Sequence, residues 1–448
     1  MTSVQNRLQQ LSGNKIKYYF SFCLVIFILS SCNIFKKSQR NNDVIILEPH
    51  KSDSSTAKNK NDKDSLAAEN ATKTEAKGKS WAKKDVYNIA FILPFEMDAI
   101  ELNTLLGEGK VTGYQPLASI EFYEGALIAL DSLKTLGVNL NVFIYDNIKD
   151  DSATSLLFAK PEMKTMDLIV GPMFNQSLKI AADFAKKNEI FLVSPLSPSN
   201  NITTDNRYYL IANATLKMQL KKTLEFFYRS DPNANVIVVY RTDKDAESKI
   251  GKEFLSCFRA DSVLKTDHKI IEVNSASGVS SNIKTGVKNY IFIASTDELF
   301  VNGLIRSLST MSRGNENINI VGMPGLMDME SISIDYYESL NFHYPTAYWI
   351  DPNAPRTERF INSFENKYET YPSDFAFRGY DLTFYFGQLL KVYGPDITSN
   401  LDKYITLKSP LYRFHFVPHT DENNNLKFYE NENVVILKYD NYRFEKVN

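Results

Sequence analysis

The polar residues best placed to do chemistry in this sequence stand directly after runs of apolar residues. One run ends in Gly-Pro and is followed by Asn175 and Ser177, and the next run ends at Ser194, with Ser197 three residues later. If the first run is a strand that leads into a helix, the free backbone N–H groups at the helix start and the side chains of Asn175 and Ser177 can hold an anion or a carboxylate. Asn175 or Ser177 can instead be the N-cap of that helix, which contributes about 1 kcal/mol without a ligand. The sequence leaves both interpretations open.

A second set of polar residues, Thr296 and Asp297, follows the apolar run at residues 290–294. The Asp297 carboxylate can pair with an ammonium group of a ligand. An Asp directly before Glu298 and an apolar helix is also typical of an N-cap, so this role stays open as well. Asp328, which follows a later apolar run, is a second candidate partner for a cation.

The motifs of the common enzyme classes are missing from the sequence, which has no Walker loop, HExxH, CxxC or GxSxG. His415 and His419 are four residues apart, but Pro418 and the strand-like pattern deny them the helical face that metal-binding pairs use. Asp381 is expected to be a structural hydrogen-bonding residue at a helix start, and Cys257 a small buried hydrophobe. The net charge of −2 predicts no nucleic-acid partner. We therefore predict no catalytic residue, no metal and no cofactor, and a chemistry of binding.

Alternating strands and helices must position these residues. Residues 86–95 form a nearly continuous apolar run closed by proline, which is typical of a central parallel strand. An amphipathic helix follows from Ser119, and the alternation continues to residue 193 and repeats over residues 216–322. The pattern predicts an α/β fold with mostly parallel sheets flanked by helices. Because roughly 364 residues exceed what one core usually serves, we expect two lobes.

The N-terminus is typical of an export signal. Lys15 and Lys17 precede an apolar run that ends in Leu-Ser-Ser-Cys at Cys32. The run has about a dozen residues, whereas a membrane-spanning helix needs about 20. Leu-Ser-Ser-Cys resembles the bacterial lipobox, which implies a signal peptide over residues 1–31 and a lipid on Cys32. A signal anchor with an ordinary cysteine is the alternative.

Residues 32–85 combine the lipidated Cys32 with a polar stretch that has neither a helical nor a strand period. Such a stretch cannot bury enough apolar surface to fold, so we predict a disordered tether. No acidic cluster follows Cys32, and in some lipoproteins such a cluster favours export to the cell surface. We expect a protein of the cell envelope that is lipid-anchored in the outer membrane and faces the periplasm.

Four stretches together resemble the type I periplasmic binding proteins, the superfamily of leucine-binding and other amino-acid-binding receptors. The resemblance implies a two-lobed domain over residues 86–446, with interlobe crossovers near residues 211–214, 346–350 and 409. Lobe 1 is expected at about 86–210 and 351–408, and lobe 2 at about 215–345 and 409–446. The four stretches are residues 88–94 with Phe-Tyr-Glu-Gly-Ala-Leu at 122–127, Asp-Leu-Ile-Val-Gly-Pro at 167–172 with 184–194, Phe-Ala-Phe-Arg-Gly-Tyr-Asp at 375–381, and the strand pair at 414–416 and 433–437.

The resemblance implies that a small solute binds outside the carboxyl ends of the strands. An amino acid, a peptide or a related carboxylate would then be delivered to an ABC transporter. Two positions depart from the family pattern: Pro198 stands where a hydroxyl is expected, leaving Ser197 or Ser199 as substitutes, and the loop at 295–297 is polar where the family often has an aromatic residue.

These departures favour an alternative. The chain is also similar to the penicillin-binding-protein activators, outer-membrane lipoproteins whose two-lobed domain regulates peptidoglycan synthases. The partner would then be an envelope protein rather than a small molecule. The long segment at residues 96–116 is expected to cover the ligand site or to dock a partner.

The substitution Cys32→Ala tests the anchor. Because the thiol of Cys32 is the predicted acceptor of the lipid, we expect the variant to stay unlipidated and to leave the membrane fraction. Cell fractionation with an immunoblot measures this, and Cys257→Ala serves as the control. A Cys32→Ala variant that sediments with membranes as the wild type does would contradict the lipobox interpretation.

Overall fold

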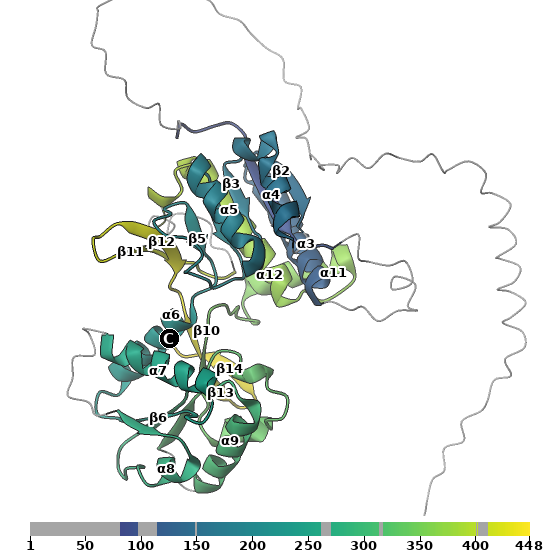
Figure 1. Ribbon diagram of the computed structural model, residues 1–448. Helices are drawn as coiled ribbons and strands as arrows, with labels where there is room; N and C mark the ends of the chain where they lie inside the picture. The colour runs from purple at the N-terminus through teal and green to yellow at the C-terminus, as the bar shows by residue number, and fades with distance from the viewer. Residues whose placement is uncertain are drawn as a thin grey trace, which may run out of the picture. The chain divides into compact units, whose positions relative to one another are not determined.

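The structure is a computed structural model that describes residues 81–96, 114–147, 150–260, 270–312, 317–399, 401 and 411–448. The predicted leader, Cys32, residues 33–80 and most of the segment at 96–116 lie outside the described residues. Within the described ranges, no helix is long and apolar enough to cross a membrane. Two mostly parallel sheets, each flanked by helices, make up two lobes (Figure 1), which confirms the predicted α/β class.

The sheet of the first lobe has seven strands in the order β11-β12-β5-β4-β3-β1-β2. All neighbours are parallel except β11 and β12, which form an antiparallel hairpin. The inner strands are buried on both faces, as their continuous apolar runs predict. The strands are β1 (Tyr87–Leu93), β2 (Leu140–Asp146), β3 (Leu168–Val170), β4 (Phe191–Ser194), β5 (Tyr209–Ile211), β11 (Phe416–Thr420) and β12 (Leu426–Asn431).

Helices cover both faces of this sheet. Right-handed crossovers place α3 on one face and α4 and α5 on the other, and α12 and α11 pack beside α3 (Figure 1). Two of the helices begin at side-chain caps, with Asp150 accepting from the N–H of Ala153 and Ser373 from that of Phe375. The bounds are α3 (Tyr114–Thr135), α4 (Asp151–Ala159), η1 (Pro161–Thr165), α5 (Asn175–Asn188), α11 (Pro355–Tyr368) and α12 (Asp374–Tyr393).

The second lobe repeats this plan with a seven-stranded sheet in the order β14-β13-β10-β9-β8-β6-β7. Its last strands are antiparallel: β13 pairs with both β10 and β14. The strands are β6 (Asn235–Val239), β7 (Ile271–Val273), β8 (Asn289–Ile293), β9 (Ile318–Val321), β10 (His343–Thr346), β13 (Val435–Asp440) and β14 (Arg443–Lys446). The helices are α6 (Leu216–Ser230), α7 (Asp245–Ala260), α8 (Ala276–Ser280), α9 (Glu298–Ser312), η2 (Leu326–Asp328) and α10 (Ile334–Ser339).

The tail differs from the expected division of the lobes. Residues 409–446 were assigned to lobe 2, but β11 and β12 extend the first sheet, with Tyr429 and Glu430 paired to β5. The chain therefore enters the second sheet only after Asn431. The polar turn at residues 421–425 closes a hairpin, and β12 was missed because its polar residues hide the alternation.

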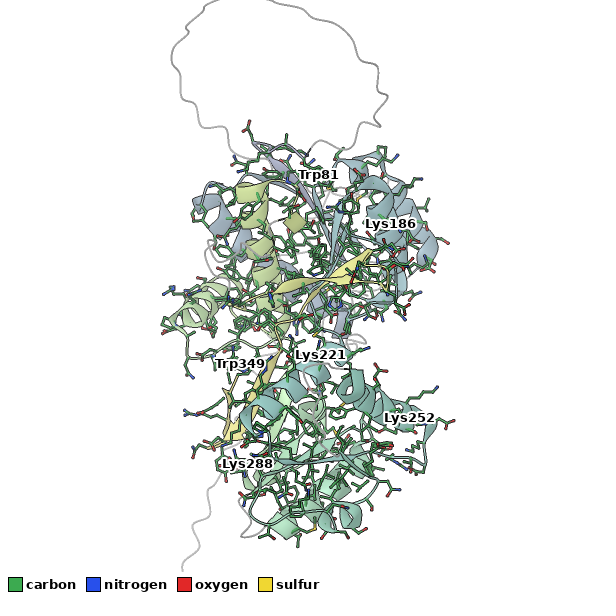
Figure 2. The ribbon with its side chains drawn as sticks, turned by 90° about the vertical axis from the view of Figure 1, so that its left-hand side faces the viewer. Trp81, Lys186, Lys221, Lys252, Lys288 and Trp349 are labelled. Carbon is green, nitrogen blue, oxygen red and sulfur yellow. The ribbon has the colours of Figure 1, made fainter. Side chains whose placement is uncertain are left out.

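The folded body also begins earlier than the expected residue 86. Trp81 packs its ring against Phe191 and Tyr208, with ring centroids 5.9 and 6.2 Å apart, and Lys84 forms a 2.5 Å ion pair with Asp167. Phe191 opens β4 and Tyr208 directly precedes β5, so Trp81 lies at the edge of the first sheet where the strands begin (Figure 2). Residues 81–85 are therefore part of the lobe rather than of the predicted tether.

The helices α3 and α12 cross with their backbones in close contact. A Cβ on Gly125 would lie 1.8 Å from the carbonyl oxygen of Ala376, and one on Gly379 would lie 1.9 Å from that of Phe122. Both neighbours are backbone atoms, so a larger residue would force the two helices apart. The two glycines allow the buried apolar side chains of α12 to reach the sheet core.

We expect Gly125→Ala and Gly379→Ala each to lower the free energy of unfolding by more than about 3 kcal/mol, because overpacking against rigid backbone has no local relief. Denaturant unfolding of the purified body measures the effect. Gly303→Ala is the matched control, since Gly303 lies in α9 with open space around it, and it should gain about 0.5–1 kcal/mol. Equal effects at Gly303 and Gly379 would refute the close crossing.

Candidate functional site

The predicted ligand-binding residues of the first lobe do lie at the carboxyl ends of neighbouring parallel strands. β3 leads through Gly171 and Pro172 to α5, and β4 ends at Ser194 before the loop at residues 195–199. Gly171 has φ +99, and a Cβ there would lie 2.1 Å from the carbonyl oxygen of Ile92 on β1. Only glycine fits this approach, which keeps the turn after β3 close to the turn after β1.

Asn175 links the two loops and does not cap the helix. The residue that precedes α5 is Phe174, which provides no side-chain cap. The Asn175 Oδ1 instead accepts hydrogen bonds from the hydroxyls of Ser197 and Ser199, the latter at 2.8 Å. Ser194 Oγ donates to the carbonyl oxygen of Ser197 at 3.0 Å. The capping role is therefore wrong for Asn175, and the structure brings Asn175, Ser194 and Ser197 together in one hydrogen-bonded cluster.

Ser177 points away from this cluster. It is 2% exposed, and its Oγ lies 3.0 Å from the Oγ1 of Thr154 on α4. Thr154 also bonds to Asn147 Oδ1 at 2.9 Å. Ser177 thus joins α5 to α4 inside the lobe and is neither a cap nor a group open to a ligand, because it is the third residue of the helix and lies on its buried face.

Thr296 of the second lobe is held by a buried carboxylate. Glu247 on α7 accepts hydrogen bonds from the backbone N–H and the hydroxyl of Thr296, at 3.1 and 2.7 Å, and from the hydroxyl of Ser295. These donors outweigh the burial of Glu247, and its pKa lies below the ordinary value. Sequence reasoning missed Glu247, because the 48 or 49 residues that separate it from Ser295 and Thr296 hide the contact.

Asp297 is the N-terminal cap of α9, since its Oδ1 accepts the N–H of Phe300 at 2.9 Å. Its Oδ2 pairs with Lys244 at 2.6 Å and with Arg241 at 2.9 Å. The bond from Lys244 contributes most to lowering the pKa of Asp297 to about 2. The capping alternative is confirmed, and the charge that was expected to meet a ligand cation is already matched within the lobe. Asp328 ends η2 and is exposed.

One cationic group of the first lobe was not assigned a role from the sequence. Arg378 lies in the second turn of α12 and stacks its guanidinium over the ring of Tyr348, 4.1 Å from the centroid. Its Nη1 donates one long hydrogen bond of 3.4 Å to Asn213 Oδ1, and among the described residues no carboxylate lies within 4 Å of it. Asn213 Nδ2 donates in turn to the carbonyl oxygen of Leu196, in the loop that also holds Ser197.

Asp381, one turn further along α12, is fully buried and connects the segment after β10 with the segment before β11. Its carboxylate accepts from Tyr348 Oη at 2.7 Å and from the N–H groups of Leu411 and Tyr412 at 2.6 and 2.9 Å. The structural role expected for Asp381 agrees with these bonds. The expected helix start is wrong, because α12 already begins at Asp374.

The arrangement offers hydrogen bonds and charge rather than a reactive group. No cluster of three or more metal-ligating side chains occurs in the described part of the chain. His419 lies in strand β11, as the strand-like pattern predicts, and its Nε2 lies 3.3 Å from Glu432 and 3.4 Å from Glu430. Cys257 is buried, as expected, and its pKa is raised by that burial.

A family model described as periplasmic binding protein matches residues 111–401. The chain belongs to the periplasmic binding protein family. A search among curated proteins found no match.

Solved structures show the same fold for this periplasmic binding protein. A branched-chain amino acid ABC transporter protein from Rhodospirillum rubrum matches with a TM-score of 0.57 at 14% identity, over 81% of this chain and all of that one. A branched-chain amino acid ABC transporter periplasmic ligand-binding protein from Burkholderia xenovorans gives 0.56 at 12% identity, over 81% and 94%. Full-length LpoA from Haemophilus influenzae gives 0.50 at 14% identity, over 82% of this chain and 60% of its own length.

Ionisation of Asp381 makes the stability of this binding protein depend on pH. Burial raises the pKa of Asp381 to about 7, although Tyr348, Leu411 and Tyr412 all donate to it. The unfolded chain has the lower, ordinary value near 4, so the stabilising contribution is complete below pH about 4 and is lost as pH rises to about 7.

We expect the free energy of unfolding of the wild type, relative to Asp381→Asn, to fall by up to about 4 kcal/mol between pH 4 and pH 7. Denaturant unfolding of both proteins across this range gives the difference, in which the other titrating groups cancel. A difference that stays constant with pH would show that ionisation of Asp381 has no cost in the fold.

Proposed function

We propose that this periplasmic binding protein is a non-catalytic lipoprotein of the cell envelope that binds a small carboxylate-bearing solute, such as an amino acid or a peptide, for an ABC transporter. The observation that carries this proposal is the guanidinium of Arg378, which has no anionic partner among the described residues. It is joined through Asn213 to the loop at the carboxyl end of β4. Proteins described as branched-chain amino acid transporter components share the fold, which supports the choice of ligand class.

A half-buried arginine is normally matched by a carboxylate or by several hydrogen bonds, because desolvation of its charge is costly. Among the described residues, Arg378 has the ring of Tyr348 on one side and a single 3.4 Å bond to Asn213, which leaves most of its five N–H donors without a partner there. Burial lowers the pKa of Arg378, which marks the desolvation that an anion would relieve. A ligand carboxylate is the planar, two-oxygen partner that a guanidinium prefers.

The remaining polar groups at the strand ends restrict the ligand further. The hydroxyls of Ser197 and Ser199 both donate to Asn175. Toward a ligand they therefore act as hydrogen-bond acceptors rather than donors. Asp297 is already neutralised by Arg241 and Lys244. We therefore infer that recognition depends on the carboxylate of the solute more than on its ammonium group.

The second candidate function is an interaction module for an envelope protein, such as a peptidoglycan synthase. The observation that favours it is that the polar side chains at both sets of strand ends form hydrogen bonds within the protein. In the second lobe, Glu247 occupies the donors of Ser295 and Thr296. LpoA shares the fold, and the sequence resembles the penicillin-binding-protein activators.

Outer-membrane anchoring through Cys32 and a periplasm-facing body remain part of the proposal. The support is the Leu-Ser-Ser-Cys sequence, the polar stretch that follows it and the membership of the periplasmic binding protein family.

The substitution Arg378→Gln tests the proposed function. A panel of amino acids, short peptides and cell-wall fragments is screened by thermal shift, since a ligand that binds only the native state raises the melting temperature. For each stabilising compound we expect Arg378→Gln to weaken binding at least tenfold, because a charge-assisted bond contributes about 1.5–3 kcal/mol. Arg229→Gln, an exposed change of the same charge on α6, should bind as the wild type does.

Retention of full affinity in Arg378→Gln would remove Arg378 from the site. If no compound in the panel shifts the melting temperature while a cell-wall synthase co-purifies with the wild type, the interaction module becomes the correct function. The melting temperature without ligand reports any loss of fold in the variant.

A further inference from the structure

A cavity lies in the first lobe among helices, apart from the strand ends. It has a volume of about 480 Å³, and α3, α11 and α12, which lie side by side in Figure 1, form its walls. This volume is within the range of small-molecule sites, about 300–1,000 Å³. Its lining residues are Ile128, Ser132, Arg356, Arg359, Phe360, Ser363, Tyr380, Phe384 and Leu411.

Each helix contributes one continuous stripe to the wall. Residues 356, 359, 360 and 363 of α11 follow the spacing i, i+3, i+4 and i+7, and α3 and α12 each contribute a pair four residues apart. At 1.5 Å per residue the α11 stripe is about 10 Å long. The cavity is therefore elongated along a helix, as suits a chain-like or flat ligand.

The floor of the cavity is apolar and aromatic. Tyr380 stacks on Phe384 with ring centroids 5.5 Å apart and an angle of 12°, and it packs on Phe360 at 4.8 Å. Both serine hydroxyls already donate a hydrogen bond within their own helix. Ser132 Oγ donates to the carbonyl oxygen of Ile128 at 3.0 Å, and Ser363 Oγ donates to that of Arg359 at 2.8 Å.

Charge is present on one wall only. Arg356 and Arg359 are both exposed, and none of the lining residues is acidic. Among the residues that the structure describes, Arg359 has no ion-pair partner, and the nearby Asp131 on α3 is paired with Lys367 at 3.0 Å. Burial and the charge of Asp381 raise the pKa of Tyr380, whereas the hydroxyl of Ser132 and the charges of Arg356 and Arg359 lower it.

We propose that this cavity is a binding site for an anionic amphiphile, a single carboxylate on an aliphatic or aromatic body of about 10 Å. The guanidinium groups of Arg356 and Arg359 hold the carboxylate at the rim. Phe360, Tyr380 and Phe384 bury the apolar body. This site does not depend on the proposed solute site, since no residue is shared between them.

Decanoate is the probe for this site, titrated by calorimetry into the folded body below its micelle-forming concentration. We expect saturable binding by the wild type and at least tenfold weaker binding by the double variant Arg356→Gln, Arg359→Gln. The matched control is Arg229→Gln, Arg306→Gln, which removes the same charge from exposed positions of α6 and α9 and should leave the affinity unchanged. Decanol, which has the same chain without the charge, should bind at least tenfold more weakly.

A second variant separates the cavity from the arginines. Ser132→Phe fills the space between α3 and α12 and keeps both charges, so it should abolish decanoate binding, while Arg378→Gln should leave binding intact. Absence of saturable binding by the wild type would overturn the proposal. Equal affinity in the arginine variant, equal binding of decanol or loss of binding in Arg378→Gln would overturn it as well. Failure of Ser132→Phe to fold leaves the arginine variant and decanol as decisive comparisons.

Discussion

The carboxylate of Asp381 is the centre of a hydrogen-bond network that reaches each of the three segments running between the two sheets. It binds the hydroxyl of Tyr348, in the segment after β10, and the backbone of Leu411 and Tyr412, in the segment before β11. Tyr412 continues the network to Asn431, whose Nδ2 also donates to the carbonyl oxygen of Ala212 at 2.9 Å. Segments that are far apart in the sequence thus meet around one buried carboxylate, and a single helix, α12, positions them.

The same helix explains why Arg378 lies where it does. Arg378 and Asp381 are three residues apart and so project from the same side of α12, where one lies against the ring of Tyr348 and the other against its hydroxyl. The close crossing at Gly125 and Gly379 sets the depth of α12 against α3. The position of Arg378, the cationic group that we propose binds the ligand, therefore follows from helix packing, which is more rigid than a loop.

The sequence was informative where one interaction dominates and less so where several compete. The runs at β1, β3, β4, β6 and β8 are buried on both faces, so continuous apolar residues predict them well. Asn175 and Ser177 were placed on the correct turn, but the direction of each side chain depends on Ser199 and Thr154, which lie on other elements. Asp297 could be assigned as a cap because that signal is local, whereas its partner Arg241 is 56 residues away.

The resemblance to a family predicted the fold more completely than it predicted the site. Family membership implies strands whose carboxyl ends meet, and the loops after β3 and β4 do meet through Asn175 and Ser197. The chemical groups at such an edge belong to loop side chains. These side chains can differ without lowering the stability of the sheet. In the second lobe, the carboxylate of Glu247 accepts the hydrogen bonds of the Ser295 and Thr296 hydroxyls at this edge. A fold that tolerates this exchange can serve a solute receptor or a partner-binding domain with the same backbone.

The described chain begins at the edge of the first sheet that lies opposite the carboxyl ends of its strands. Trp81 and Lys84 attach the chain to the edge of the first sheet at which the strands begin, through Phe191, Tyr208 and Asp167. Parallel strands carry their carboxyl ends at the opposite edge, and that edge holds Asn175, Ser197 and the loop joined to Arg378. The described chain therefore begins at the edge of the first sheet that is remote from Asn175 and Ser197.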